Sequence, residues 1–187
     1  MMWSEYRREK IECYEKAKRQ GKIDGDIVPL LEKINEKENY VTLSSCSGRI
    51  LVIDLNSFGD KKSSEFLGKW HNYASFEEVL ESVNRCRRQG WLIQDPPILH
   101  VACKDLISAR KLMAAANNSG FRRSGIISLQ NYVVEIASFE RLELPVAIDG
   151  KRIVEENYLR IAVKIANEKL RSGKSKIKRL EELISSF

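Results

Sequence analysis

The sequence lacks most of the short motifs by which cofactor and metal sites are recognised. Its 10 glycines include no pair spaced two residues apart, so neither a GxGxxG fingerprint nor a Walker-type phosphate loop is present. Its four cysteines form no CxxC pair and it has only two histidines, which leaves little for a structural zinc site. We therefore expect no resident metal, and a nucleotide-like cofactor would have to bind without the usual doubly wound fingerprint.

Long apolar segments are also missing. No run approaches about 18 consecutive apolar residues, the length that a membrane span needs, so no membrane partner is expected. Residues 1–8 carry charges where a signal peptide has an apolar stretch, which argues against secretion. The simplest interpretation of the four scattered cysteines is that they are reduced thiols of a cytoplasmic protein.

Positive charge is concentrated at the two ends of the chain. The net charge is +6; residues 1–22 carry seven basic and four acidic side chains, and residues 151–187 carry ten and five. The middle, residues 23–150, has fifteen basic and seventeen acidic side chains. Such asymmetry suggests a polyanionic partner such as nucleic acid, although two solvated helices with lysine-rich outer faces would give the same pattern.

Hydrophobic periodicity predicts alternating groups of helices and strands. Helices are expected over residues 3–20, 27–38, 76–89, 106–118, 153–171 and 174–185. Strands are expected near residues 40–45, 49–55, 66–72, 91–93, 98–103, 122–129, 132–138 and 142–148, with a polar loop over 56–64. The expected caps are Asp26, Asp105 and a Ser75–Glu78 capping box, and the expected helix stops are Gly21, Gly90, Gly120 and Gly173.

This order of elements predicts an α+β fold: a mixed or antiparallel sheet with flanking helices, not a doubly wound Rossmann arrangement. The chain is expected to form a single domain, residues 1–187, with a core of about 22–150 and basic helical segments at 1–21 and 151–187. Each of Asp26 and Asp105 precedes a helix and three strands, which suggests pseudo-duplicated α-β-β-β halves with a cleft between them.

The most informative segment is a serine-rich turn, residues 42–49, which reads TLSSCSGR between two predicted strands. Small side chains leave backbone N–H groups free to face a ligand, and Gly48 permits an unusual turn. Arg49 offers a planar fork of donors that suits a carboxylate or phosphate. The segment predicts a site for an anionic ligand; an ordinary hairpin turn is the alternative. The expected ligand-binding residues are Ser44, Ser45, Cys46, Ser47, Gly48 and Arg49.

Other candidate residues have structural alternatives. Trp70 could stack on a base, with Lys69 beside it, and His71 could accept a proton near neutral pH; a core tryptophan beside a hydrogen-bonded histidine is the alternative. His100 lies in an apolar strand, where a satisfied interior histidine is usual. Further candidates are Asp24 for a ligand amine and, for phosphate, the segment that contains Arg122, Ser124 and Gly125.

Four strings in this order resemble the tRNA wybutosine-synthesising protein 3 family, in a stand-alone, archaeal-looking form. They are SSCSGR at 44–49, GKWH at 68–71, LHVAC at 99–103 and GFRRSGI at 120–126. The resemblance runs from about Lys22 to Pro145, and the terminal helices carry less of it.

The resemblance implies an S-adenosyl-L-methionine-dependent methyltransferase with a fold distinct from the doubly wound methyltransferases. Its expected reaction methylates N4 of a demethylated wyosine intermediate, the base 3′ of the anticodon in phenylalanine tRNA. His71 or Asp24 would take the proton from N4, and the serine turn would hold the carboxylate of the cofactor or of an arm on the base. The partner would be the tRNA anticodon loop, with the basic terminal helices along its backbone.

Three alternatives stay open at this point. The chain could be a tRNA-binding module without catalysis, which would not bind S-adenosylmethionine. It could use Cys46 as a covalent nucleophile with His71 or His100 as base, although nitrogen methylation needs no cysteine adduct. The serine turn could also be purely structural.

Overall fold

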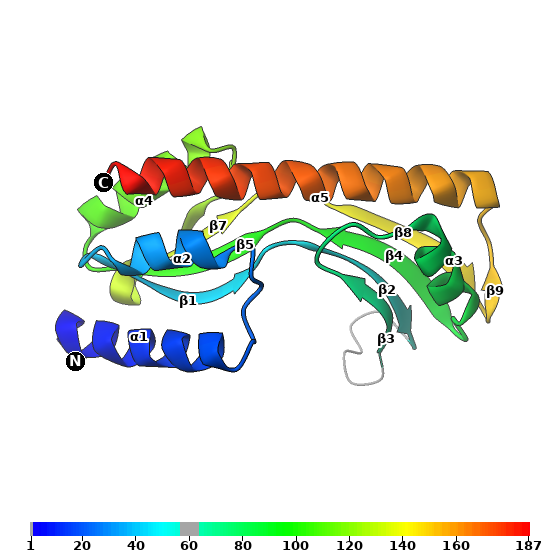
Figure 1. Ribbon diagram of the computed structural model, residues 1–187, viewed down its shortest axis with the longest axis horizontal. Coiled ribbons are helices and arrows are strands. Elements are labelled where there is room, and N and C mark those ends of the chain that lie inside the picture. The colour runs from blue at the N-terminus through cyan, green and yellow to red at the C-terminus, as the bar shows by residue number, and fades with distance from the viewer. Residues whose placement is uncertain (1, 57–63) are drawn as a thin grey trace. The chain divides into compact units, whose positions relative to one another are not determined.

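The computed structural model describes residues 2–56 and 64–187. Its helices are α1 (Trp3–Arg19), α2 (Val28–Asn35), α3 (Phe76–Asn84), α4 (Leu106–Asn118) and α5 (Glu156–Ser185), as Figure 1 shows. Its strands are β1 (Tyr40–Cys46), β2 (Arg49–Leu55), β3 (Glu65–Trp70), β4 (Gln89–Asp95), β5 (Ile98–Cys103), β6 (Gly125–Ser128), β7 (Val133–Ala137), β8 (Leu142–Ile148) and β9 (Lys151–Arg152).

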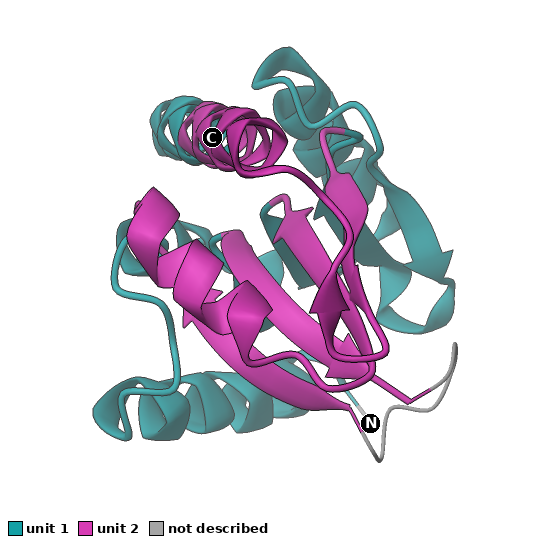
Figure 2. Ribbon diagram, turned by 90° about the vertical axis from the view of Figure 1, so that its right-hand side faces the viewer, with its two compact units in different colours: residues 1–47, 97–139, 173–187 teal, residues 48–96, 140–172 magenta. Residues whose placement is uncertain are grey.

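The strands form two sheets in which every recorded pairing is antiparallel, with orders β1-β5-β7-β6 and β3-β2-β4-β8-β9. The prediction of an α+β fold that is not doubly wound is confirmed. The chain clusters into two compact units, coloured separately in Figure 2. Unit 1 comprises residues 1–47, 97–139 and 173–187, and unit 2 comprises residues 48–96 and 140–172.

Unit 1 holds the four-stranded sheet, and its core is closed by α2, α4 and the last part of α5. Helix α1 contacts β1, an edge strand of that sheet. Arg7 donates from Nε to the carbonyl of Tyr40 at 3.1 Å, and Trp3 donates from its indole N–H to the carbonyl of Glu38 at 2.8 Å. The helix thus satisfies backbone acceptors near an otherwise open strand edge.

Unit 2 holds the five-stranded sheet, and α3 and the first part of α5 cover one of its faces. The side chains that form this core include Ile50 and Leu92 of the sheet, Val79 of α3 and Leu159 of α5. Asn167 of α5 ties the helix down, because its side chain exchanges hydrogen bonds of 3.0 and 2.9 Å with the backbone of Ala74.

Two of the three predicted helix caps are confirmed. The Ser75 hydroxyl accepts from the backbone N–H of Glu78, and the Glu78 carboxylate accepts from the backbone N–H of Ser75 at 2.8 Å. These two bonds form the predicted capping box. The Asp105 carboxylate accepts from the Ser108 N–H at 2.7 Å. The predicted Asp26 cap is wrong: α2 begins after Ile27 with Pro29 in its first turn, and Asp26 instead pairs with Lys174.

Two glycines that were expected to stop helices lie inside regular elements. Gly90 is part of β4. A Cβ at this position would lie 2.4 Å from Sγ of Cys86. Helix α3 therefore ends earlier than expected, at Asn84. Gly173 lies within α5, which runs unbroken where two helices were predicted, and a Cβ at this position would lie 2.6 Å from Cδ of Pro97. Both glycines allow close packing rather than a break.

The serine turn is not a hairpin. β1 pairs with β5, whereas β2 pairs with β3 and β4, so the strands on either side of the turn belong to different sheets. The predicted pseudo-duplicated halves do not form separate sheets either, because each half contributes strands to both sheets. Strand β9 was not predicted, and most of the polar loop expected over 56–64 lies outside the described residues.

Candidate functional site

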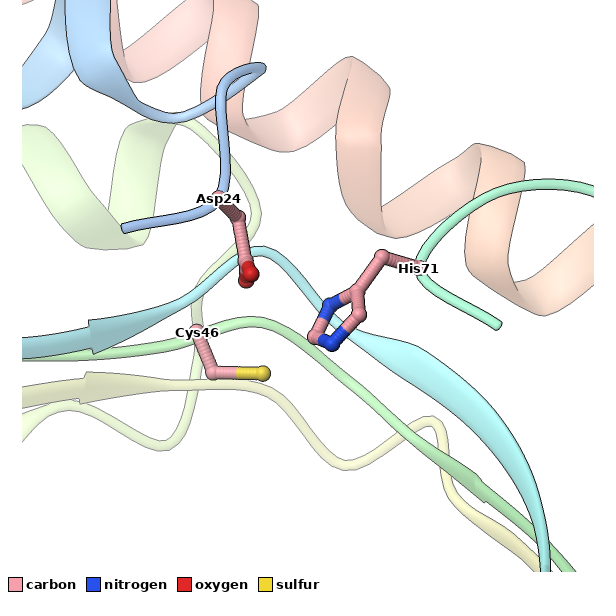
Figure 3. A group of neighbouring side chains, drawn as sticks. All are labelled: Asp24, Cys46 and His71. Carbon is pink, nitrogen blue, oxygen red and sulfur yellow. The ribbon is translucent and has the colours of Figure 1, made fainter. Parts of the chain in front are cut away.

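The serine turn brings Asp24 to the end of β1. The backbone N–H of Ser47 donates to the Asp24 carboxylate at 2.8 Å, and Ser47 is completely buried. A carboxylate oxygen of Asp24 lies within 4.8 Å of Sγ of Cys46, and Figure 3 draws both side chains. Gly48 follows with φ +89°, the left-handed conformation that favours glycine. The loop before α2 and the end of β1 therefore place the Asp24 carboxylate and the Cys46 thiol together in unit 1.

A second polar group of unit 1 runs across its sheet from β1 to β7. The Ser44 hydroxyl lies 2.8 Å from Nδ1 of His100, and Nε2 of His100 lies 3.1 Å from Glu135. The other oxygen of Glu135 pairs with Arg123 at 3.4 Å. We call these four side chains the Ser44–Arg123 chain.

The Ser44–Arg123 chain fixes the hydrogens of its first two members. An ionised carboxylate can only accept, so Nε2 of His100 carries the hydrogen toward Glu135. In neutral His100, Nδ1 is then an acceptor for the Ser44 O–H. The Ser44 oxygen is left with lone pairs to offer, so this serine is prepared to accept a hydrogen bond from a ligand.

A groove of about 620 Å³ lies in unit 1 and has Ser44 in its wall. The groove is lined by Tyr6, Lys10, Cys13, Tyr14, Ala17, Lys22, Ile23, Leu31, Thr42, Leu43, Ser44 and Ser45. Its volume falls in the range of small-molecule sites, and its lining combines aromatic walls with hydroxyls and two lysines. Burial raises the pKa of the Tyr14 hydroxyl, so the Tyr14 side chain stays neutral and can donate a hydrogen bond over the physiological range.

The segment after α4 contributes differently from what its sequence predicted. The Ser124 hydroxyl donates to the Phe121 carbonyl at 2.7 Å, a local bond within the turn. Gly125 lies opposite Glu135 in the sheet, and Arg122 is exposed. Arg123, the second of the two arginines that this segment offered for phosphate, is the one that pairs with Glu135 in the Ser44–Arg123 chain.

In unit 2, the structure places two predicted site residues on opposite faces of the sheet. Trp70 lies opposite Ile50 and packs against the core that α3 and α5 cover. It folds back over Gly68, where a Cβ would lie 2.2 Å from its ring. Arg49 lies on the other face and pairs through Nε with Asp95 at 3.3 Å. Lys69 alternates with Trp70 and shares the face of Arg49, and His71 follows the end of β3.

None of the four cysteines, all of which lie in the described part of the chain, forms a disulfide, and their thiols differ in environment. Burial raises the pKa of Cys86 to about 11 and that of Cys103 to about 12, so both stay protonated near neutral pH. Cys13 is exposed and Cys46 is half-buried. His100, one of the two bases considered for Cys46, has its ring nitrogens engaged by Ser44 and Glu135.

Sequence reasoning missed the partners of its candidate residues. Glu135 contacts His100 and pairs with Arg123, and Asp95 pairs with both Arg49 and Arg141. One usable signal was present: Glu135 is the only charged residue of the short apolar strand VVEIA, and a charge in such a strand needs a partner.

The comparisons with known proteins agree with one another. The family model described as Methyltransferase TYW3 matches residues 2–186. A protein of Archaeoglobus fulgidus is 56% identical over 100% of this chain and 95% of its own length. Its name is tRNA(Phe) 7-((3-amino-3-carboxypropyl)-4-demethylwyosine(37)-N(4))-methyltransferase. A Pyrococcus abyssi protein with the same name, numbered 1, is 45% identical over 97% of this chain and 95% of its own length.

Solved structures give the same result. The PH1069 protein of Pyrococcus horikoshii superposes with a TM-score of 0.93 at 45% identity, over 97% of this chain and 95% of its own. A hypothetical protein from Aeropyrum pernix gives 0.68 at 29% identity, over 86% and 98%.

An antiparallel α+β fold without a glycine fingerprint, and a serine turn held by an aspartate, define a class of methyltransferase apart from the doubly wound enzymes. The chain belongs to the TYW3 methyltransferase family. The predictions of family, of fold class and of methyltransferase activity are confirmed. None of the helices in the described part of the chain is long and apolar enough to cross a membrane.

Proposed function

We propose that this protein transfers a methyl group from S-adenosylmethionine to N4 of a demethylated wyosine base in the anticodon loop of phenylalanine tRNA. The observation that carries the proposal is the full-length, 56% identical relative whose name states the N4 reaction and tRNA(Phe). That name also describes a base that bears a 3-amino-3-carboxypropyl arm, an α-amino acid on a purine-derived ring.

The residues of unit 1 fit S-adenosylmethionine, which when bound supplies an electrophilic methyl group on a sulfonium. The groove beside α1 has apolar and aromatic walls for an adenine ring, and Lys10 and Lys22 are cations for a carboxylate. The Ser44 oxygen, held as an acceptor by His100, suits an ammonium group. This donor and acceptor set matches an α-amino acid carried on a flat ring.

The chemistry asks the protein for alignment and for one proton acceptor. As the N4 nitrogen forms its bond to the methyl carbon, the proton on N4 must leave, and an oriented base contributes about 10²–10⁴-fold to such steps. Asp24 and His71 are the two candidates. Asp24 has a fixed orientation, because the Ser47 N–H holds one of its oxygens at 2.8 Å.

The test is methyl transfer itself. Purified protein would be incubated with S-adenosylmethionine and phenylalanine tRNA that carries the N4-unmethylated base, and the digested nucleosides weighed by mass spectrometry. The expected result is the mass of one added methyl group in place of hydrogen on that base. If the protein binds tRNA but neither binds S-adenosylmethionine nor changes the base, a non-catalytic tRNA-binding module is the correct account.

A further inference from the structure

The five-stranded sheet of unit 2 has one face that the helices of the unit leave uncovered. Side chains of α3 and α5 pack against Ile50, Val52 and Leu92, which point to one side of the sheet. Residues that alternate with these point to the other side, since successive side chains of a strand face opposite ways. Figures 1 and 2 show both helices on the same side of this sheet. We call the other side the open face; its exposed side chains surround Leu51 and Ile93, which are buried.

An aromatic row crosses the middle of the open face. Cα pairing aligns Phe66 of β3, Ile53 of β2, Trp91 of β4 and Pro145 of β8. Phe66 is 56% exposed, and Trp91 is half-buried. A single exposed apolar side chain is unremarkable, whereas apolar side chains that lie next to one another on a surface mark an interaction site.

Cations flank the aromatic row. Lys69 and Lys151 are exposed on the same face, at positions opposite Leu51 and Ile148. At one end of the sheet Asp95 bridges two arginines, with Nε of Arg49 at 3.3 Å and Nε of Arg141 at 3.2 Å.

The bridging carboxylate holds the two guanidinium groups side by side. In the described part of the chain, Arg49 is bound through Nε alone, so its terminal nitrogens keep their donors. Arg141 is 52% exposed and uses one terminal nitrogen toward Glu143 at 3.3 Å. Paired guanidinium groups with unused planar donors match the oxygens of a phosphate.

We infer that the open face of unit 2 binds single-stranded RNA, with bases stacked on Phe66 and Trp91 and phosphates held by Arg49, Arg141 and Lys69. The inference rests on the proposed function and names the surface for its tRNA substrate. The sheet surfaces of RNA-recognition domains use the same physics, because every base has a π-face and every nucleotide a negative charge. Exposed rings beside cations fit an unpaired loop, because its bases are free to stack and each of its nucleotides carries a phosphate.

The experiment measures RNA binding by the full-length protein without a cofactor. The probes are a fluorescent hairpin with the anticodon stem and loop of phenylalanine tRNA, and a duplex of the same stem without the loop. Phe66→Ala should weaken hairpin binding about tenfold and leave duplex binding unchanged, as the loss of one stacked base predicts. Lys69→Ala should weaken binding about threefold and lower the salt slope by about one phosphate contact.

Matched controls separate this face from general effects of charge and folding. Phe139→Ala removes an exposed aromatic of unit 1, and Lys104→Ala removes an exposed cation of the same unit, outside the basic terminal segments. Both should bind the hairpin like the unchanged protein, and all four variants should keep their thermal midpoint. The inference is overturned if Phe66→Ala and Lys69→Ala bind the hairpin normally, if the controls weaken it equally, or if Phe66→Ala weakens the duplex as much.

Because this assay measures binding alone, it separates the inference from the proposed reaction. Loss of hairpin binding in the two face variants supports the open face even if no methyl transfer is found. If the unchanged protein transfers the methyl group and the two face variants bind RNA normally, the proposed reaction is supported and the inference about the open face is overturned.

Discussion

The two units hold their polar side chains in different ways. In unit 1, Asp24, Ser44 and His100 are fixed by directed hydrogen bonds of 2.8 to 3.1 Å from the backbone or from partly buried side chains. In unit 2, Arg49 and Arg141 are held by ion pairs of 3.2 and 3.3 Å between more exposed groups. Directed bonds position atoms for chemistry, whereas exposed ion pairs contribute little stability and exchange partners readily. The contrast suits a reaction centre in unit 1 and an RNA surface in unit 2.

The largest effect should come from the carboxylate of unit 1. Asp24→Asn keeps the shape and an acceptor for the Ser47 N–H but removes the charge and the basicity. If Asp24 takes the N4 proton, kcat for methyl transfer should fall about 10²-fold or more with little change in the KM for tRNA. Asp26→Asn, in the same loop, breaks only the pair with Lys174 and should retain activity. Equal activity of both variants would leave His71 as the proton acceptor.

A stability test asks how tightly unit 1 is packed. Gly173→Ala should destabilise the protein by about 1–3 kcal/mol, because the new Cβ meets the rigid ring of Pro97 at 2.6 Å. The helix propensity of alanine offsets only about 1 kcal/mol of that cost. Gly25→Ala, with no atom within 4 Å of its Cβ, should change stability little. Thermal unfolding of the two variants decides the matter, and a higher midpoint for Gly173→Ala would contradict the close contact.

A smaller effect should follow from disturbing the Ser44–Arg123 chain. In Glu135→Gln the amide oxygen still faces Arg123, so the amide N–H donates to Nε2 of His100. Nδ1 then carries the hydrogen and donates to Ser44, which occupies one of the two lone pairs that Ser44 offers to the groove. The KM for S-adenosylmethionine should rise about fivefold, the worth of one hydrogen bond, with kcat nearly unchanged. Glu135→Asp should restore part of the affinity. Nitrogen chemical shifts of His100 would report the change of tautomer, and an unaltered KM would show that Ser44 does not contact the cofactor.

The smallest expected effect compares the helix caps of the two units on acidification. Hydrogen bonds from Ser108 lower the pKa of Asp105 in unit 1, and hydrogen bonds from Ser75 lower the pKa of Glu78 in unit 2. A lowered folded-state pKa adds stability above the unfolded pKa, which is lost as pH falls through the folded value. Asp105→Asn and Glu78→Gln should therefore lower stability by more near pH 7 than near pH 3 in urea unfolding. A loss of equal size at both pH values would rule out this linkage.

Local signals in the sequence predicted local structure. The Ser75–Glu78 and Asp105 caps were readable because each depends on residues within one turn. The failures at Gly90 and Gly173 have a different origin: a glycine that ends a helix and a glycine that admits a distant neighbour look the same along the chain. Only the fold brings Ala147 against Gly90 and Pro97 against Gly173.

The sequence predicted which residues belong to the candidate site but not which side chains contact one another. The serine turn, Asp24 and His100 were all identified, yet their actual partners lie on other elements. Glu135 reaches His100 across the β5–β7 pairing, and Asp95 reaches Arg49 across the β2–β4 pairing. Strand register decides which side chains meet, and β1 pairing with β5 instead of β2 could not be read from the turn alone.

Helix α5 has a consequence for how the protein is made. It supplies Leu159, Val163 and Leu170 to the core of unit 2, and Ile177, Leu180 and Ile184 to that of unit 1. Synthesis proceeds at about 5–20 residues per second from the N-terminus, so every strand leaves the ribosome before this helix does. Neither core can close until residues 159–184 have emerged, and until then both sheets present apolar faces that chaperones can bind.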